Sequence, residues 1–147
     1  MSIRKPEIFL EKTGSRDVFE RMIDKTQRAD EVIVCSFAVD ENFLRRLTKA
    51  REKIGKLTLI LDFTLARRNR TRLIRAAELA DELYCGNTHA KLFLIRSAEY
   101  SAVCALSANA TTNYRYECGT ILADRESIEV AENLIEKMKK DCVRIER

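Results

Sequence analysis

The sequence predicts an α/β domain in which a mixed β-sheet carries helices on both of its faces. Apolar runs of strand length alternate with amphipathic helical patterns in the first half of the chain, and strand-like runs follow one another in the second half. Alternation with helices favours parallel strands, whereas consecutive strands favour antiparallel pairing. The chain has 147 residues, the length of an ordinary domain, and we expect residues 1–147 to form a single one.

Helical patterns and buried strands take turns in the first half of the chain. Ser15 is a candidate N-cap for a first helix, because serine is among the residues preferred at that position. Residues 31–37 and 57–63 form short, continuous apolar runs, which are typical of buried strands. Between these runs, Asp40 is placed to cap a second helix. The apolar faces of the two helices comprise Val18, Phe19, Met22, Ile23, Phe43, Leu44 and Leu47.

The second half is predicted to supply the remaining strands and a long final helix. An arginine-rich stretch leads into a helix at residues 73–83, followed by a short strand within residues 82–85. Three further strands are predicted at residues 90–96, 101–107 and 116–123. Residues 124–127 open the last helix. Its apolar face comprises Ile128, Ala131, Leu134, Ile135, Met138 and Cys142.

The composition excludes several classes of protein. Hydrophobic residues make up 46% of the chain and charged residues 34%, values that a disordered protein does not have. No apolar run approaches the roughly 18 residues that a membrane-spanning helix needs. Residues 1–7 lack the apolar core of a signal peptide. We therefore expect a cytoplasmic protein that has no membrane partner.

The cysteine pattern gives no indication of a metal site. The chain has 5 cysteines, and no two of them are spaced as C-x-x-C. They are Cys35, Cys85, Cys104, Cys118 and Cys142. We expect reduced, buried thiols that behave as small hydrophobic residues. With a single histidine in the chain and no ligand spacing, we expect neither a metal nor a cofactor.

The single histidine lies in the most chemically informative stretch. Side chains two residues apart project from the same face of a strand, so His89 and Lys91 should lie together, as should Ser107 and Asn109. If these strands are neighbours, an imidazole, an ammonium, a hydroxyl and an amide gather in one place. This set suits an anionic tetrahedral group, which Lys91 and Asn109 would hold while His89 attacks or donates a proton. The alternative for Ser107 and Asn109 is a simple turn.

These residues resemble the motif of the phospholipase D superfamily. His89-Ala90-Lys91 matches H-x-K, Ser107-Ala108-Asn109 matches S-x-N with Thr111 in the common extension, and Glu117 matches the later glutamate. The chain is similar in size to one family half-domain, and it looks most like the small single-motif members, several of which are nucleases. Two positions depart from the pattern: Arg96 stands where the family has an aspartate, and Leu106 where it has a glycine.

The resemblance implies a two-step, metal-independent transfer through a covalent phosphohistidine. His89 would be the nucleophile, Lys91, Ser107 and Asn109 would hold the phosphate, and Glu117 would orient His89. A second histidine must protonate the leaving oxygen, and this chain has only 1. The resemblance therefore implies a homodimer in which the two copies of His89 meet across a two-fold axis.

Nucleic acid is the predicted substrate. The net charge is +4, and five arginines crowd one stretch that has no acidic residue. They are Arg67, Arg68, Arg70, Arg72 and Arg75. These observations favour a nuclease of low sequence specificity, acting on DNA or RNA. A solvated loop is the plainer explanation of the arginines. The alternative functions are an inactive nucleic-acid-binding module, a phospholipid phosphodiesterase, and a structural subunit of a larger assembly.

Overall fold

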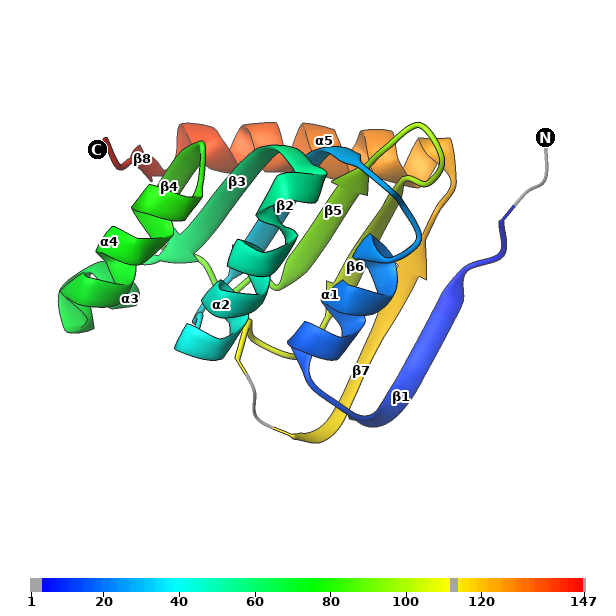
Figure 1. The fold of residues 1–147 in the computed structure, drawn as a ribbon, viewed down its shortest axis with the longest axis horizontal. Coiled ribbons are helices and arrows are strands. Elements are labelled where there is room, and N and C mark those ends of the chain that lie inside the picture. The colour runs from blue at the N-terminus through cyan, green and yellow to red at the C-terminus, as the bar shows by residue number, and fades with distance from the viewer. Residues whose placement is uncertain (1–3, 112–113, 147) are drawn as a thin grey trace.

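Eight strands form one mixed sheet within residues 4–111 and 114–146, the part of the chain that the computed structural model describes (Figure 1). Their order across the sheet is β1-β7-β6-β5-β2-β3-β4-β8. The strands are β1 (Glu7–Thr13), β2 (Ala29–Ser36), β3 (Ile54–Asp62), β4 (Glu82–Gly86), β5 (Leu92–Arg96), β6 (Ala102–Leu106), β7 (Arg115–Leu122) and β8 (Val143–Arg144). The helices are α1 (Ser15–Ile23), α2 (Glu41–Ala50), α3 (Phe63–Arg68), α4 (Arg70–Leu79) and α5 (Arg125–Lys140), with a 3-10 turn, η1, at Arg51–Lys53.

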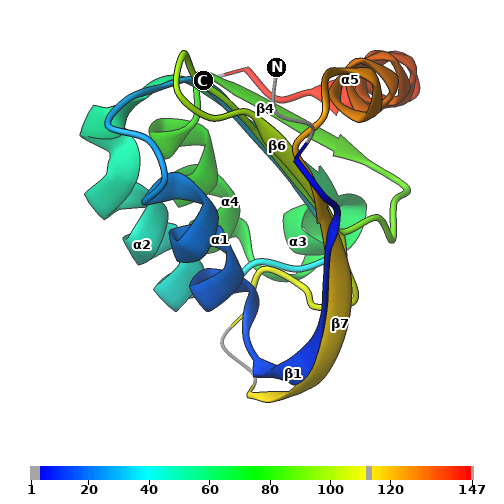
Figure 2. The same ribbon diagram turned by 90° about the vertical axis from the view of Figure 1, so that its right-hand side faces the viewer.

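The helices form two layers around the sheet, as the sequence predicts. Helices α1, α2 and α4 cover one face, and α5 lies on the other (Figures 1 and 2). The larger core fills the space beneath α1 and α2, where the rings of Phe19, Phe43 and Phe93 pack 5.7–5.8 Å apart. The smaller core joins Leu94 of the sheet to Ile135 of α5. The predicted α/β class is confirmed.

Strand β1 has no counterpart among the predicted elements. It pairs only with β7, antiparallel, at one edge of the sheet. Its apolar side chains do not all point into the core: Phe9 is buried, whereas Ile8 and Leu10 are 82% and 74% exposed. An alternating pattern with apolar residues on both faces gives no clear strand signal, because periodicity is recognised when one face is apolar and the other polar.

Two helix starts differ from the prediction, and two agree with it, namely those of α2 and of α5, which Asp124 caps. Asp40 caps α2 and accepts a hydrogen bond from the Phe43 backbone N, as predicted. The prediction for Ser15 is wrong: Gly14 is the N-cap of α1, and Ser15 is its first helical residue, with a buried hydroxyl that bonds elsewhere. The helix predicted from residue 73 begins at Arg70, where the Asn69 side chain caps it.

The cysteines are free thiols. The prediction that they are buried is confirmed for three of the five. Cys35, Cys85 and Cys104 are buried, and burial raises the pKa of Cys35 and of Cys104 to about 12. Cys142 is half-buried, and Cys118 is exposed. The apolar run around Cys118 misled the prediction, because β7 lies next to the edge strand and one of its faces is open.

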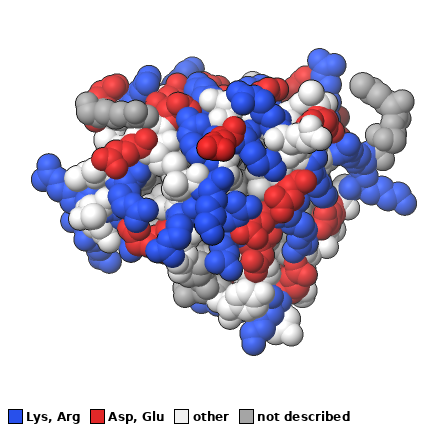
Figure 3. Space-filling view, viewed as in Figure 1, with Lys and Arg blue, Asp and Glu red and all other residues white. Residues whose placement is uncertain are grey.

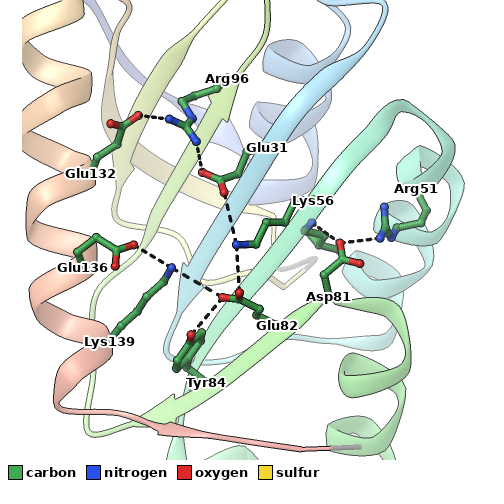
Figure 4. Close-up of polar contacts among 11 residues, drawn as sticks. Glu31, Arg51, Lys56, Asp81, Glu82, Tyr84, Arg96, Glu132, Glu136 and Lys139 are labelled. Atoms are coloured by element: carbon green, nitrogen blue, oxygen red, sulfur yellow. Dashed lines mark hydrogen bonds and ion pairs between the residues drawn. The ribbon is translucent and has the colours of Figure 1, made fainter.

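A ladder of alternating charges ties α5 to the sheet (Figure 4). In order it comprises Glu132, Arg96, Glu31, Lys56, Glu82, Lys139 and Glu136. The shortest contact joins Arg96 to Glu31, at 2.7 Å, and the contacts of Lys56 with Glu82 and of Lys139 with Glu136 are both 3.0 Å long. Because successive members belong to β5, β2, β3, β4 and α5, the ladder crosses the sheet and fixes the helix upon it. No helix in the described ranges is long and apolar enough to cross a membrane.

Glu82 should make folding acid-sensitive. Burial alone would raise its pKa, but the hydrogen bond and charge of Lys56 lower the pKa of Glu82 below its ordinary value. The stabilisation is therefore present above the unfolded pKa of about 4.3 and is lost as the pH falls through the lower folded pKa. We expect Glu82→Gln to reduce the free energy of unfolding by about 0.5–1 kcal/mol at neutral pH, and by less near pH 3.

Urea denaturation of both proteins at neutral and acidic pH measures this difference. Glu52→Gln is the matched control, because Glu52 is exposed and makes no ion pair with any residue between 4 and 146 that the structure describes. A Glu82→Gln variant that loses the same stability at every pH would contradict the assigned cause.

Candidate active site

The direction of β5 brings the sequence motifs to one end of the sheet. β5 runs antiparallel to both of its neighbours, β2 and β6. Its amino end therefore lies beside their carboxyl ends, which places residues 89–91 next to residues 107–109. The pairing continues one step past the strand, since the Leu106 backbone N donates to the Lys91 O at 3.3 Å. The neighbouring strands on which the prediction depended are thus adjacent.

His89 and Lys91 lie in the loop before β5, which begins at Leu92 and not at residue 90 as predicted. Their side chains nevertheless meet: Lys91 Nζ lies 2.9 Å from His89 Nδ1 and donates to the His89 backbone O, also at 2.9 Å. The cause is the folding back of the lysine side chain and not the alternation of a strand. The imidazole is exposed and packs on the ring of Phe37, with centroids 4.7 Å apart.

The contact with Lys91 determines the tautomer of His89. A lysine ammonium carries donors and no acceptor, so Nδ1 of His89 must be the acceptor. A neutral ring then holds its proton on Nε2, the ring nitrogen that Lys91 does not contact. In this arrangement His89 presents an N–H group to a ligand, as a general acid does.

Ser107 and Glu117 form a second pair at this end of the sheet. Ser107 Oγ donates to Glu117 Oε2 and accepts from the Cys118 backbone N at 3.0 Å. Glu117 is buried, and its Oε1 accepts from Arg115 Nε at 3.1 Å. Within one copy of the described chain, Glu117 makes no hydrogen bond or ion pair with His89. The hydroxyl of Ser107 is already engaged, so it holds Glu117 in place.

The backbone of the Asn109 loop is fixed by two buried serines that the sequence analysis did not single out. Ser15, at the start of α1, donates to the Ala108 O at 3.0 Å and the Asn109 O at 2.6 Å. Ser36, the last residue of β2, accepts from the Ala110 N at 2.9 Å. The side-chain Oδ1 of Asn109 is buried and has no hydrogen-bond partner among the described residues. The backbone of this loop is thus held by hydrogen bonds from α1 and from the end of β2.

Asp62 fixes the loop that carries His89. Its Oδ2 accepts from the Thr88 backbone N at 3.0 Å, and its Oδ1 accepts from Thr64 at the start of α3. Burial would raise the pKa of Asp62, but the bonds from Thr64 and Thr88 and the charge of Arg67 lower it overall. Asp62 and Ser36 each end a buried strand. A polar residue at the carboxyl end of an apolar run is the signal that would have found both.

The arginine stretch divides into two groups. Arg72 and Arg75 are occupied by Glu41 of α2, and Arg72 also donates to the Val39 O at 3.1 Å. Arg67, Arg68 and Arg70 are exposed, and none forms an ion pair with a carboxylate in the described ranges. Figure 3 shows basic and acidic side chains interspersed over the face of α1, α2 and α4. The basic surface near the site is therefore local, and it centres on the α3–α4 junction.

Arg96 lies at the other end of β5 from the His89 loop. It faces Glu31 across the β2–β5 pair and contacts Glu132 of α5 at 3.1 Å (Figure 4). The residue that departs from the family pattern is thus a member of the charge ladder. Across residues 4–111 and 114–146, no group of three or more His, Cys, Asp or Glu side chains could hold a metal ion.

Comparisons with known proteins find similar folds but no similar sequences. No family model matches the chain, and no curated protein does. NucT from Helicobacter pylori is 21% identical, with a TM-score of 0.73 over 96% of this chain and 99% of that one. Nuc from Salmonella typhimurium, a phospholipase D family member, is 13% identical, with a TM-score of 0.71 over 97% and 100%.

The DNA-binding chromatin protein TrmBL2, from an archaeon, is also similar. It is 13% identical, with a TM-score of 0.69 over 97% of this chain and 55% of TrmBL2, so the chain spans about half of that protein. Identities this low establish the fold alone. The chain has a phospholipase D-like fold, as the order of its H-x-K and S-x-N motifs implied.

Proposed function

We propose that this protein is a metal-independent phosphodiesterase that cleaves nucleic acid through a phosphohistidine, in an active site shared by two copies of the chain. The observation that carries the proposal is the contact of Lys91 with His89 directly beside the Asn109 loop. Such a site offers a nucleophile, a cation and an amide to one tetrahedral anion. Its setting is a fold shared with Nuc, a phospholipase D family member.

The first step forms a bond between His89 Nε2 and phosphorus. Lys91 and Asn109 bind the non-bridging oxygens, and as Lys91 turns to them, Nδ1 becomes free to hold the ring proton while Nε2 attacks. The P–O bond to the leaving group breaks, and the leaving oxygen takes a proton from the second His89. In the second step that histidine takes a proton from water, and the resulting hydroxide displaces His89 from phosphorus.

The second histidine must come from another copy of the chain. We place that copy against an uncovered apolar groove. The groove has a volume of about 450 Å³ and runs between α5 and the sheet, from Val130 and Leu134 to Leu92 and Ala90. Val130 and Leu134 are 53% and 60% exposed, although both are apolar. Because Ala90 is bonded to His89, a two-fold axis at this end of the groove brings two imidazoles together.

The open face of the sheet continues this groove toward β1. Leu122 of β7 lines the groove, and Cys118 lies four residues earlier on the same face of the strand. Cys118 pairs directly with Leu10, and Thr120 with Ile8, so these side chains share that face. An exposed apolar surface of this kind is typical of a protein interface. Its extension past the groove supports a second copy as the partner.

Nucleic acid is the substrate that the charges favour. Arg67, Arg68 and Arg70 follow the end of β3, at the same end of the sheet as His89, and form no ion pair with a carboxylate among the described residues, although the charge of Arg67 acts on Asp62. Unpaired arginines beside a phosphodiester site suit a polymer with a phosphate at every step. Phosphate contacts of this type carry no sequence information, which agrees with low specificity. The fold shared with a DNA-binding chromatin protein supports the same substrate.

Replacement of the nucleophile should abolish turnover. We expect wild-type protein to cleave DNA or RNA in the presence of EDTA, and His89→Ala to lose at least 1,000-fold of that rate, on the order of 4 kcal/mol in the barrier. Gel electrophoresis of labelled strands measures both cleavage and binding. Thr71→Ala, at an exposed position on α4, is the control. Equal rates for His89→Ala and wild type would end the catalytic proposal, and a gel shift without cleavage would favour a binding module.

A charge in the apolar groove should separate the two copies. We expect Leu134→Asp to convert a dimer to a monomer and to lose cleavage together with dimerisation, because a carboxylate cannot be buried there without a partner. Sedimentation measures the mass, and circular dichroism tests folding. Ile74→Asp is the matched control, since Ile74 is 50% exposed on α4 at the opposite face. A folded Leu134→Asp monomer with full activity would refute the shared site.

A further inference from the structure

A small pocket lies against the candidate active site. It has a volume of about 160 Å³ and is enclosed by the loop after β2 and by α3 and α4. Phe37, Ala38 and Leu65 supply its apolar walls, and Arg68 and Arg72 its polar ones. Phe37 is the residue whose ring packs on His89, at 4.7 Å between centroids and 37° between planes. One aromatic ring therefore separates the pocket from the imidazole.

The size and walls of the pocket fit one flat ring. An engineered protein cavity of about 150 Å³ binds benzene, so a space of this volume holds one six-membered ring. Ala38 and Leu65 give such a ring apolar contact, and Phe37 gives it an aromatic wall. Stacking between a nucleobase and an aromatic side chain is tolerant of sequence, because every base has a π-face.

The arginines on the pocket wall are only partly paired. Arg72 Nε is buried and lies 3.9 Å from Glu41 Oε1, an ion-pair distance, but it makes no hydrogen bond with any described residue, while Nη1 of the same guanidinium donates to the Val39 O. A buried donor without an acceptor is costly, and a carbonyl oxygen of a ligand would satisfy it. Arg68 is exposed and forms no ion pair in the described ranges, so it is free to contact a phosphate at the rim.

We propose that this pocket binds one unpaired pyrimidine base of the strand whose phosphodiester lies at His89. The base stacks on Phe37, a ring carbonyl accepts from Arg72 Nε, and Arg68 contacts the adjacent phosphate. A base within a duplex is already paired and stacked, so the pocket selects single-stranded nucleic acid. The inference rests on the proposed phosphodiesterase function and adds to it the strand type and the residues that choose it.

Binding without turnover tests the pocket separately from the chemistry. In the His89→Ala background, fluorescence anisotropy measures the affinity for labelled oligothymidine, for a duplex of equal length, and for an abasic strand. We expect oligothymidine to bind most tightly. Ala38→Leu, which fills the pocket, should weaken that binding by about 5- to 150-fold, the equivalent of one stacked base, and leave the abasic strand unaffected. Ala98→Leu, at an exposed turn after β5, is the matched control.

Photocrosslinking provides a measurement that does not depend on the folding of a variant. A strand that carries 5-iodouracil should crosslink to the segment 37–39 of the His89→Ala protein. Crosslinks only outside the pocket, or a folded Ala38→Leu protein that binds oligothymidine as before, would overturn the proposal. Equal affinity for duplex and single strand would do the same. Failure of the proposed function is a different result: wild-type protein would bind the strand in this way and never cleave it.

Discussion

The antiparallel course of β5 between β2 and β6 is the constraint on which the candidate site depends. Parallel strands β2, β3 and β4 end at one edge of the sheet, and β6 ends there as well. β5 alone among these begins at that edge. The loop before β5 therefore lies beside the ends of β2 and β6, and the two halves of the motif come together although Ser107 lies 18 positions after His89.

The loops at this end of the sheet have a backbone that other residues hold in place. Main-chain atoms of the loops that carry His89 and Asn109 form hydrogen bonds with three polar side chains, those of Asp62, Ser15 and Ser36. None of the three has to touch a ligand. A phosphate site requires supporting residues that are separate from the reacting groups, because the reacting groups must keep their geometry when the ligand displaces their own contacts.

The sequence predicted the layers and most elements because the cores are patterned simply. β2 and β3 are apolar on both faces, and α2 and α5 have one apolar face each, so their signals are local. β1 was missed because its apolar side chains divide between core and surface. α3 was missed because six residues are too few to show a helical period.

The site could be predicted only as far as its motif extends along the chain. The motif residues follow one another within a short stretch of the chain. They are His89, Lys91, Ser107, Asn109 and Glu117. The supports come from elsewhere: Ser15 lies 94 residues from Asn109, and Asp62 lies 26 from Thr88. Such pairs depend on strand order, which no local pattern contains. The engagement of Ser107 by Glu117 is likewise a matter of the register between β6 and β7.

The position of Arg96 has a consequence for how chains of this fold are recognised. Arg96 is the last residue of β5, whereas the His89 loop precedes the first, so the charge at position 96 acts on the far rim of the sheet. In this chain the contact across the rim joins a cation on β5 to a carboxylate on β2. A pattern that demands an acid at this position would pass over this chain, in which the residue there fastens the rim and does not contact the groups at the other end of β5.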